Sequence, residues 1–187
     1  DFTQTGGLTQ VEWHVTVGDE PGGDGTYELG GGATLRASQL YVGDSGTGRF
    51  VQTGGTVDIE YYSYIGKMSG IGTYEMSGGS HSVLSIYIGG SGLSAYGDDG
   101  GNGDGRWVQT GGSTSCEYMK VSGFGNGSYL ELDGGTITAR NMMVASQYRI
   151  DAIVRHTAGL LTITGDAYSD GIALGYRRRQ YGAYELS

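Results

Sequence analysis

Large apolar residues recur along this chain at a fixed distance before pairs of glycines. An aromatic or aliphatic residue stands four places before the pair, as in Phe50-Val-Gln-Thr-Gly-Gly and Tyr74-Glu-Met-Ser-Gly-Gly. The units begin at Phe2, Tyr27, Phe50, Tyr74, Trp107, Leu130, Val154 and Tyr184. The unit at Val154 has Ala158-Gly159 in place of the pair, and the sequence stops before a pair in the unit at Tyr184. Their successive spacings are 25, 23, 24, 33, 23, 24 and 30 residues, which indicates a basic period of about 24 residues with two insertions.

A second apolar landmark follows each glycine pair. It is Val17, Val42, Ile65, Ile88, Val121, Val144 or Leu174, and in most units a glycine or another small residue comes directly after it. The landmark stands nine or ten residues after the second residue of the pair in the first six units, and 15 residues after it in the seventh. Each unit is therefore predicted to hold a short strand, a glycine corner, a longer strand and a second corner.

The units alternate between two types. Those at Phe2, Phe50 and Trp107 carry Gln-Thr before the glycines and that at Val154 carries His-Thr, whereas the other four carry Glu followed by Leu or Met. One interpretation is a parallel β-solenoid of about 24 residues per coil, with coils of two types and like residues stacked in ladders. The alternative is a β-propeller with 47-residue blades. We favour the solenoid because both halves of a pair share the same landmarks, and we treat residues 1–187 as a single repeat domain.

The solenoid interpretation predicts which residues form the core. The unit-opening aromatic residues should stack in one column and the strand-end valines and isoleucines in another. The glutamines Gln4, Gln52 and Gln109 would share a column with Leu29, Met76 and Leu132. Buried amides of this kind need hydrogen-bond partners, for which backbone groups at a corner are candidates.

Composition narrows the possible functions. With 39 glycines, one proline and 17% charged residues in 187, the chain is neither an ordinary helical protein nor collagen. Its formal charge of -9 argues against nucleic acid or an anionic membrane surface as a partner, and the sequence contains no membrane-spanning run. The single cysteine, Cys116, permits no internal disulfide. The first residue is Asp1 and not methionine, which suggests a processed piece or a segment of a longer exported protein.

The alternating motifs at Phe50 to Gly55 and Tyr74 to Gly79 carry a resemblance. They resemble the glycine-rich repeats of large bacterial surface and secreted proteins, including autotransporter-like passenger regions and proteins with carboxy-terminal sorting tags. The resemblance covers nearly the whole chain and is weakest after Val154. It implies a β-solenoid exposed outside the cell, most naturally on a bacterium, and it brings no catalytic residues because the motif is structural.

Two groups of residues are candidates for binding. The insertion after Tyr96 contains Asp98, Asp99, Asn102 and Asp104, hard oxygen ligands of the kind that calcium prefers, although their spacing matches no known calcium loop. Calcium is the one cofactor that the sequence suggests. The tyrosines Tyr41, Tyr64 and Tyr87 precede the strand-end residue in three successive units and should point outward. They form a candidate glycan platform or interface, or they stack only on one another.

Catalysis has little support in the sequence. Glu28, Glu75, Glu131 and Glu185 recur with the repeat, whereas a catalytic site is normally a departure from it. The histidines His14, His81 and His156 stand at unlike positions in their units and suggest neither a metal site nor a triad. We therefore expect no enzymatic activity.

The ends of the chain suggest self-assembly. The chain begins in a Gln-Thr unit and breaks off in a Tyr-Glu-Leu unit, so one copy stacked on another would keep the alternation. The expected function is an extracellular structural or adhesive rod that polymerises head to tail through two end strands. These strands contain Phe2, Thr3, Gln4, Tyr184, Glu185 and Leu186. The alternatives are a carbohydrate-binding rod or adhesin stalk that holds surface glycans, and a polysaccharide-active enzyme.

Overall fold

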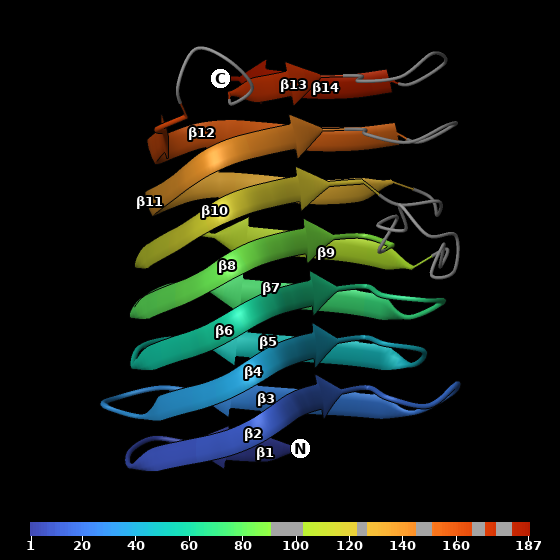
Figure 1. Ribbon diagram of the computed structural model, residues 1–187, viewed down its shortest axis with the longest axis vertical. Coiled ribbons are helices and arrows are strands. Elements are labelled where there is room, and N and C mark those ends of the chain that lie inside the picture. The colour runs from blue at the N-terminus through green and yellow to red at the C-terminus, as the bar shows by residue number, and fades with distance from the viewer. Residues whose placement is uncertain (91–102, 123–126, 145–150, 166–170, 175–180) are drawn as a thin grey trace.

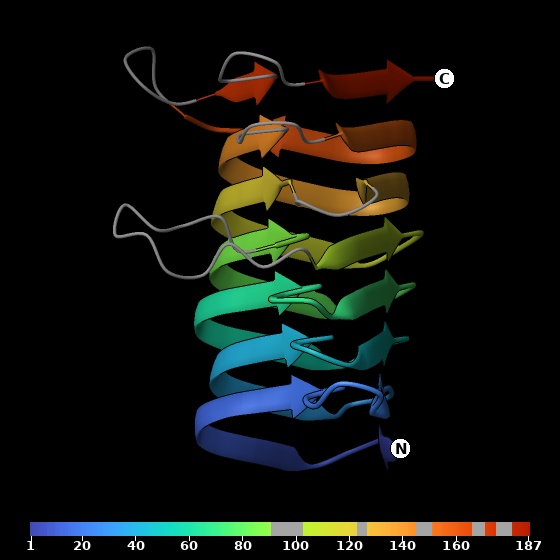
Figure 2. The ribbon, with the colours of Figure 1, turned by 90° about the vertical axis from the view of Figure 1, so that its right-hand side faces the viewer.

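Each repeat of the chain forms one coil of a parallel β-solenoid (Figure 1). The computed structural model describes residues 1–90, 103–122, 127–144, 151–165, 171–174 and 181–187. The coils stack along the long axis of the molecule, with the N-terminus at one end and the C-terminus at the other, and Figure 2 shows the same stack from the side. The predicted solenoid is confirmed. The propeller alternative is wrong, because each unit of about 24 residues pairs in parallel with the next unit and two units do not combine into a blade.

Most coils contribute one strand to each of two parallel sheets. The first sheet is built from β1 (Phe2–Gln4), β3 (Asp24–Leu29), β5 (Thr47–Gln52), β7 (Ile71–Met76) and β9 (Asp104–Gln109), followed by β11 (Ser128–Val144), β12 (Asp151–Ile163) and β14 (Tyr181–Leu186). The second sheet is built from β2 (Leu8–Val17), β4 (Thr34–Val42), β6 (Thr56–Ile65), β8 (Ser80–Ile88) and β10 (Ser113–Val121), followed by the C-terminal parts of β11 and β12 and by β13 (Ile172–Leu174). β11 and β12 run without a break through the corner that separates two strands in the earlier coils.

Both predicted landmark columns are in register. The unit-opening residues pair in chain order from Phe2 through Tyr27, Phe50, Tyr74, Trp107, Leu130 and Val154 to Tyr184. The strand-end residues pair in the same way from Val17 through Val42, Ile65, Ile88, Val121 and Val144 to Leu174. The insertions therefore leave the stacking of both columns unchanged.

The aromatic column forms the centre of the core. The rings of Tyr27 and Phe50 lie 4.9 Å apart at an interplanar angle of 11°, and those of Phe50 and Tyr74 lie 4.9 Å apart at 8°. Tyr74 and Trp107 stack at 4.1 Å and 3°. Because parallel strands repeat at about 4.8 Å, the backbone ladder itself sets the stacking distance of the rings. Phe50, Tyr74 and Trp107 are completely buried.

Candidate functional site

Buried glutamines link successive coils through hydrogen bonds. Gln52 is fully buried, and its Nε2 donates to the carbonyl oxygen of Ser80 at 2.9 Å, while its Oε1 accepts from the Tyr74 hydroxyl at 2.6 Å. Gln4 repeats the arrangement with the Thr34 carbonyl at 3.2 Å and the Tyr27 hydroxyl at 2.7 Å. The prediction that backbone groups at a corner satisfy these amides is confirmed. A hydroxyl from the following tyrosine-type coil supplies the remaining partner.

Other residues take over where this pairing is interrupted. The coil after Gln109 opens with Leu130, which has no hydroxyl, and the Thr114 hydroxyl donates to Gln109 Oε1 at 2.9 Å instead. In a later coil His156 stands in the glutamine column. Its Nδ1 lies 3.0 Å from the Tyr184 hydroxyl and its Nε2 lies 3.2 Å from the Gly159 carbonyl. Gln4, Gln52 and His156 thus find a hydroxyl in the next coil, whereas Gln109 finds one in its own coil.

His81 extends this network in the middle of the rod. It is 1% exposed, with Nδ1 at 2.7 Å from the Tyr74 hydroxyl and Nε2 at 3.0 Å from the Ser63 hydroxyl. Since the single proton of the Tyr74 hydroxyl goes to Gln52, donor counting assigns a proton to Nδ1 of His81 and leaves Nε2 as the acceptor. Burial lowers the pKa of His81 to about 3 and raises the pKa of Tyr74 well above its usual value. Both groups are neutral, which suits a structural role.

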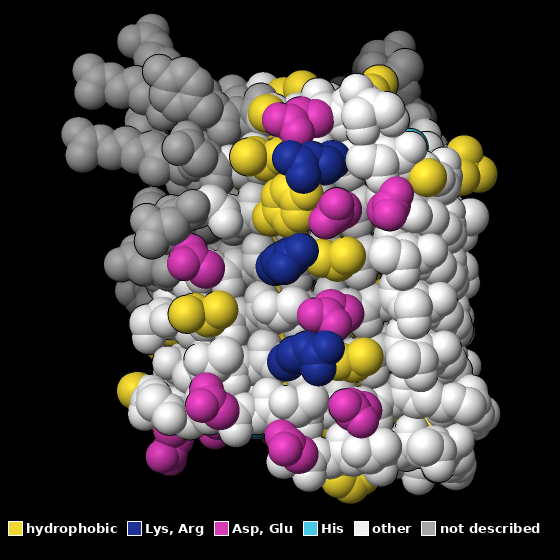
Figure 3. All heavy atoms as spheres, turned by 180° about the vertical axis from the view of Figure 1, so that it is seen from behind, with side chains coloured by type: hydrophobic (Ala, Val, Ile, Leu, Met, Phe, Trp, Pro, Cys, Tyr) yellow, Lys and Arg dark blue, Asp and Glu magenta, His cyan; other side chains and the backbone are white. Residues whose placement is uncertain are grey.

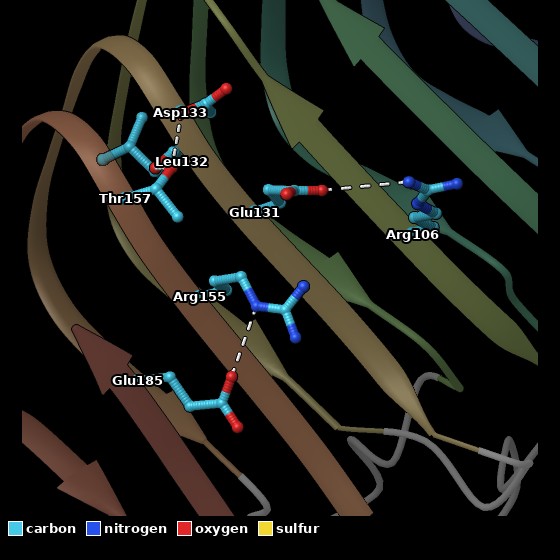
Figure 4. Close-up of polar contacts among 7 residues, drawn as sticks. All are labelled: Arg106, Glu131, Leu132, Asp133, Arg155, Thr157 and Glu185. Atoms are coloured by element: carbon cyan, nitrogen blue, oxygen red, sulfur yellow. Dashed lines mark hydrogen bonds and ion pairs between the residues drawn. The ribbon is translucent and has the colours of Figure 1, made fainter. Parts of the chain in front are cut away.

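The outward face of the first sheet carries a stripe of alternating charges (Figure 3). The predicted glutamate column is present, with Glu28, Glu75, Glu131 and Glu185 at one register position of the sheet. Arg49 pairs with Glu75 at 2.6 Å and Arg106 with Glu131 at 3.8 Å. Arg155 pairs with Glu185 at 3.3 Å, and Figure 4 shows these last two pairs on neighbouring strands. The pairs run along the rod from coil to coil, so this stripe resembles a solvated ion ladder more than paired catalytic carboxylates.

The three outward tyrosines lie where they were expected. Tyr64 stacks on Tyr87 at 5.0 Å and 17°, and Tyr41 lies 5.4 Å from Tyr64 at 35°. The ammonium group of Lys67 lies 4.3 Å from the centre of the Tyr41 ring. Tyr87 is only 7% exposed. Because the rings cover one another's faces, this column favours mutual stacking, and the glycan platform remains a prediction.

The acidic insertion is described only in part. Asp98, Asp99 and Asn102 lie outside the described residues, and Asp104 is the first residue of β9. Among the residues that the structure does describe, no group of three or more histidine, cysteine or acidic side chains could hold a metal ion. Calcium binding therefore stays a prediction.

The predicted assembly strands form the two outer edges of the first sheet. β1 pairs only with β3 and β14 pairs only with β12, so each has a second edge without a strand among the described residues. Phe2 is 51% exposed and Leu186 is 74% exposed. Thr3 donates to Glu28 at 3.3 Å, and Gln4 turns inward to the corner carbonyls. Each end thus presents an apolar column position to solvent.

Sequence reasoning missed the role of His81. It stands seven residues after Tyr74, in the same register position as Leu35, Val57, Thr114 and Ile137. A histidine aligned with buried aliphatic residues was the available signal that it lies in the core. Seven positions also separate Trp107 from Thr114, whose hydroxyl donates to Gln109.

Among the described residues, no helix has the length and apolar character needed to span a membrane. Comparison of the chain with protein-family models, with curated proteins and with solved structures found no match.

Proposed function

We propose that this chain is a non-enzymatic structural rod that works outside the cell, as part of a bacterial surface or secreted protein. The observation that carries the proposal is the continuous interior of the solenoid. Stacked rings, strand-end aliphatic residues and hydrogen-bonded glutamines run from coil to coil along the axis. This arrangement commits the buried glutamines Gln4 and Gln52 and their tyrosine partners to holding coils together.

The exterior is consistent with a structural role. The charged side chains of the first sheet pair along the axis, and the glutamates recur with the repeat. A site for chemistry normally gathers unlike groups at one place. Here the same groups are spread over the length of the rod, which suits an element that separates or positions other parts.

We further propose that copies join end to end through β14 and β1. Placing Phe2 of one copy on Tyr184 of the next would repeat the contact between Phe50 and Tyr27, and Leu186 would meet Gln4 as Leu29 meets Gln52. The joint would bury the exposed Phe2 and Leu186 side chains. Unpaired edge strands of this kind propagate by parallel pairing.

The second sheet sets the strength of this joint. In the described residues β14 has no companion strand in the second sheet, so joining β14 to β1 leaves one strand position open between β13 and β2. The joint therefore depends mainly on Phe2, Gln4, Tyr184 and Leu186. We expect assembly to be reversible and to require high protein concentration.

Electron microscopy of the purified chain at rising concentration, with sedimentation velocity and with and without calcium, tests this proposal. We expect rods that lengthen with concentration, and we expect Phe2→Asp and Leu186→Asp each to prevent the lengthening. Tyr61→Asp is the matched control, because Tyr61 is 43% exposed on the side of the rod and gains the same charge. Monomeric rods at all concentrations would reject end-to-end assembly, and hydrolysis of a polysaccharide by the purified chain would reject the non-enzymatic rod.

A further inference from the structure

The outward face of the second sheet contains a hollow of about 330 Å3 beside Ser85. Tyr62, Ser85 and Tyr118 occupy one register position on the neighbouring strands β6, β8 and β10. Two tyrosines thus flank a residue that has no ring. Ser85 itself is 3% exposed, and the hollow is lined by these three residues and by Tyr87, whose ring centre lies 6.1 Å from that of Tyr62.

The size of the gap follows from strand spacing. Adjacent parallel strands lie about 4.8 Å apart, so Tyr62 and Tyr118 stand about two such spacings from each other. Ring centres stack at 4.9 Å in the interior of this same solenoid. A six-membered ring held in the hollow would therefore be of a size to contact the side chains of both Tyr62 and Tyr118, which line it.

The wall of the hollow contains an unused hydrogen-bond donor. Asn141 lines it and is 8% exposed, and its Oδ1 accepts from the backbone N–H of Gly171 at 3.1 Å. Its Nδ2 is buried and has no hydrogen-bond partner among the described residues. Buried amide donors are nearly always satisfied, so a ligand that brings an oxygen acceptor here would complete the site.

We propose that this hollow binds one pyranose ring of a glycan. A pyranose presents C–H groups on its faces, which pack on tyrosine rings, and hydroxyl oxygens on its edge, which accept from Asn141 and exchange hydrogen bonds with the tyrosine hydroxyls. Leu84 and Tyr87 supply the remaining apolar contact. The site shares Tyr87 with the column of Tyr41, Tyr64 and Tyr87, but its other lining residues lie outside that column.

Saturation-transfer NMR tests the proposal with methyl β-D-glucopyranoside and methyl β-D-galactopyranoside as probes and the tyrosine rings as the saturated group. We expect transfer to the C–H protons of at least one glycoside. Ser85→Tyr completes the column and should reduce that transfer at least fivefold. Gln39→Tyr is the matched control, because Gln39 precedes Tyr62 at the same register position but does not line the hollow, and it should keep the signal.

Two further measurements keep the test decisive. Tyr118→Ala removes one wall at a residue that is 46% exposed, and it should weaken binding about tenfold without loss of the fold. p-Cresol serves as an aromatic competitor. Transfer to p-cresol but to neither glycoside would overturn the proposal in favour of an aromatic partner, and an undiminished signal in Ser85→Tyr would place any sugar binding elsewhere. Neither result bears on the rod, whose assembly is measured independently.

Discussion

The hydroxyl of Tyr74 donates a hydrogen bond of 2.6 Å to Oε1 of Gln52, across the boundary between two coils. The same hydroxyl accepts from Nδ1 of His81 at 2.7 Å, and Nε2 of Gln52 donates to the Ser80 carbonyl oxygen. A buried glutamine therefore needs a hydroxyl beside its side-chain oxygen. The tyrosine of the next coil supplies it to Gln4 and Gln52, and Thr114 of the same coil supplies it to Gln109.

Tyr74→Phe should destabilise the solenoid by about 3 kcal/mol, because it leaves Gln52 Oε1 and the His81 Nδ1 proton without a partner in a dry interior. Urea unfolding measures the change in free energy. Tyr27→Phe is the graded comparison, since Gln4 lies at the end of the rod and is 8% exposed, and it should cost about 1 kcal/mol. Equal costs at both positions would contradict the account.

The effects of Gln52→Met and Tyr74→Phe on the free energy of unfolding should not be additive. The methionine copies Met76 of the tyrosine-type coil, and phenylalanine then leaves it no hydroxyl to satisfy. We expect the double variant to be more stable than the sum of the single changes by about 1 kcal/mol. A double-mutant cycle in urea measures this coupling, and strict additivity would show that the hydrogen bond contributes little.

His81 should make the stability of the rod depend on pH. Its pKa is about 3 in the folded protein, below its usual value near 6.5, because burial disfavours the charged ring. The unfolded chain thus binds the proton first as pH falls, and this stability is complete above pH 6.5 and is lost on the way down toward pH 3. The loss between pH 7 and pH 5 should be about 2 kcal/mol.

The pH dependence is assigned to His81 by comparison with two variants. His81→Asn should lower stability at pH 7, and its difference from the original chain should shrink by about 2 kcal/mol at pH 5. His14→Asn removes an exposed histidine and is the matched control, measured over the same pH range. A constant difference between the His81 variant and the original chain would contradict the assignment.

Most of the fold could be predicted from the repeat, because equivalent positions of successive units pair with one another in a parallel stack. Phe2 and Tyr184 are 182 positions apart, yet the unit spacing alone placed them in one column. Leu174 also joined its column, although its unit has a longer second half. An insertion lengthens a loop without changing which strand residues pair, and this is why the ladders could be predicted through it.

The hydrogen-bonded interior and the hollow could be predicted only in part. The sequence predicted that Gln52 needs hydrogen-bond partners. It did not predict the burial of His81, which shows only when His81 is aligned with the aliphatic residues of its column. The hollow at Ser85 depends on the extra residue with which β6 turns its corner, where the pairing shifts between Ile59 and Tyr62. β2 has a bulge at the same place, between Val11 and His14, and a bulge of this kind shifts the side chains that follow it by one position.

The ion pairs on the first sheet should contribute little to stability. Arg49 and Glu75 lie 2.6 Å apart, but their side chains are 46% and 38% exposed. Arg49→Gln should therefore cost less than about 1 kcal/mol, and the cost should fall further in 1 M salt. Thermal unfolding in low and high salt measures it. If Arg49→Gln lowered the free energy of unfolding by several kcal/mol and salt did not change this loss, the ion pairs would be a major source of stability.

Gly72 should be among the positions least tolerant of substitution. It pairs with Gly48 and Gly105 in a glycine column that lies two residues before the aromatic column. At this position the backbone at the ends of second-sheet strands packs against the backbone of the first sheet. A Cβ at Gly72 would lie 2.1 Å from the Val42 carbonyl oxygen and 2.2 Å from the Gly66 nitrogen, and neither backbone atom can rotate away. Gly72→Ala should cost about 3 kcal/mol or prevent folding, at the upper end of ordinary overpacking.

Gly32→Ala provides the matched control for that substitution. Nothing lies within 4 Å of a Cβ at Gly32, and its backbone lies outside the left-handed region, so alanine should change stability by less than about 0.5 kcal/mol. Urea unfolding of the two variants compares the same chemical change at a closed and an open position. A Gly72→Ala protein as stable as Gly32→Ala would mean that the two sheets can separate at this corner, and that the glycine column is not what sets their close approach.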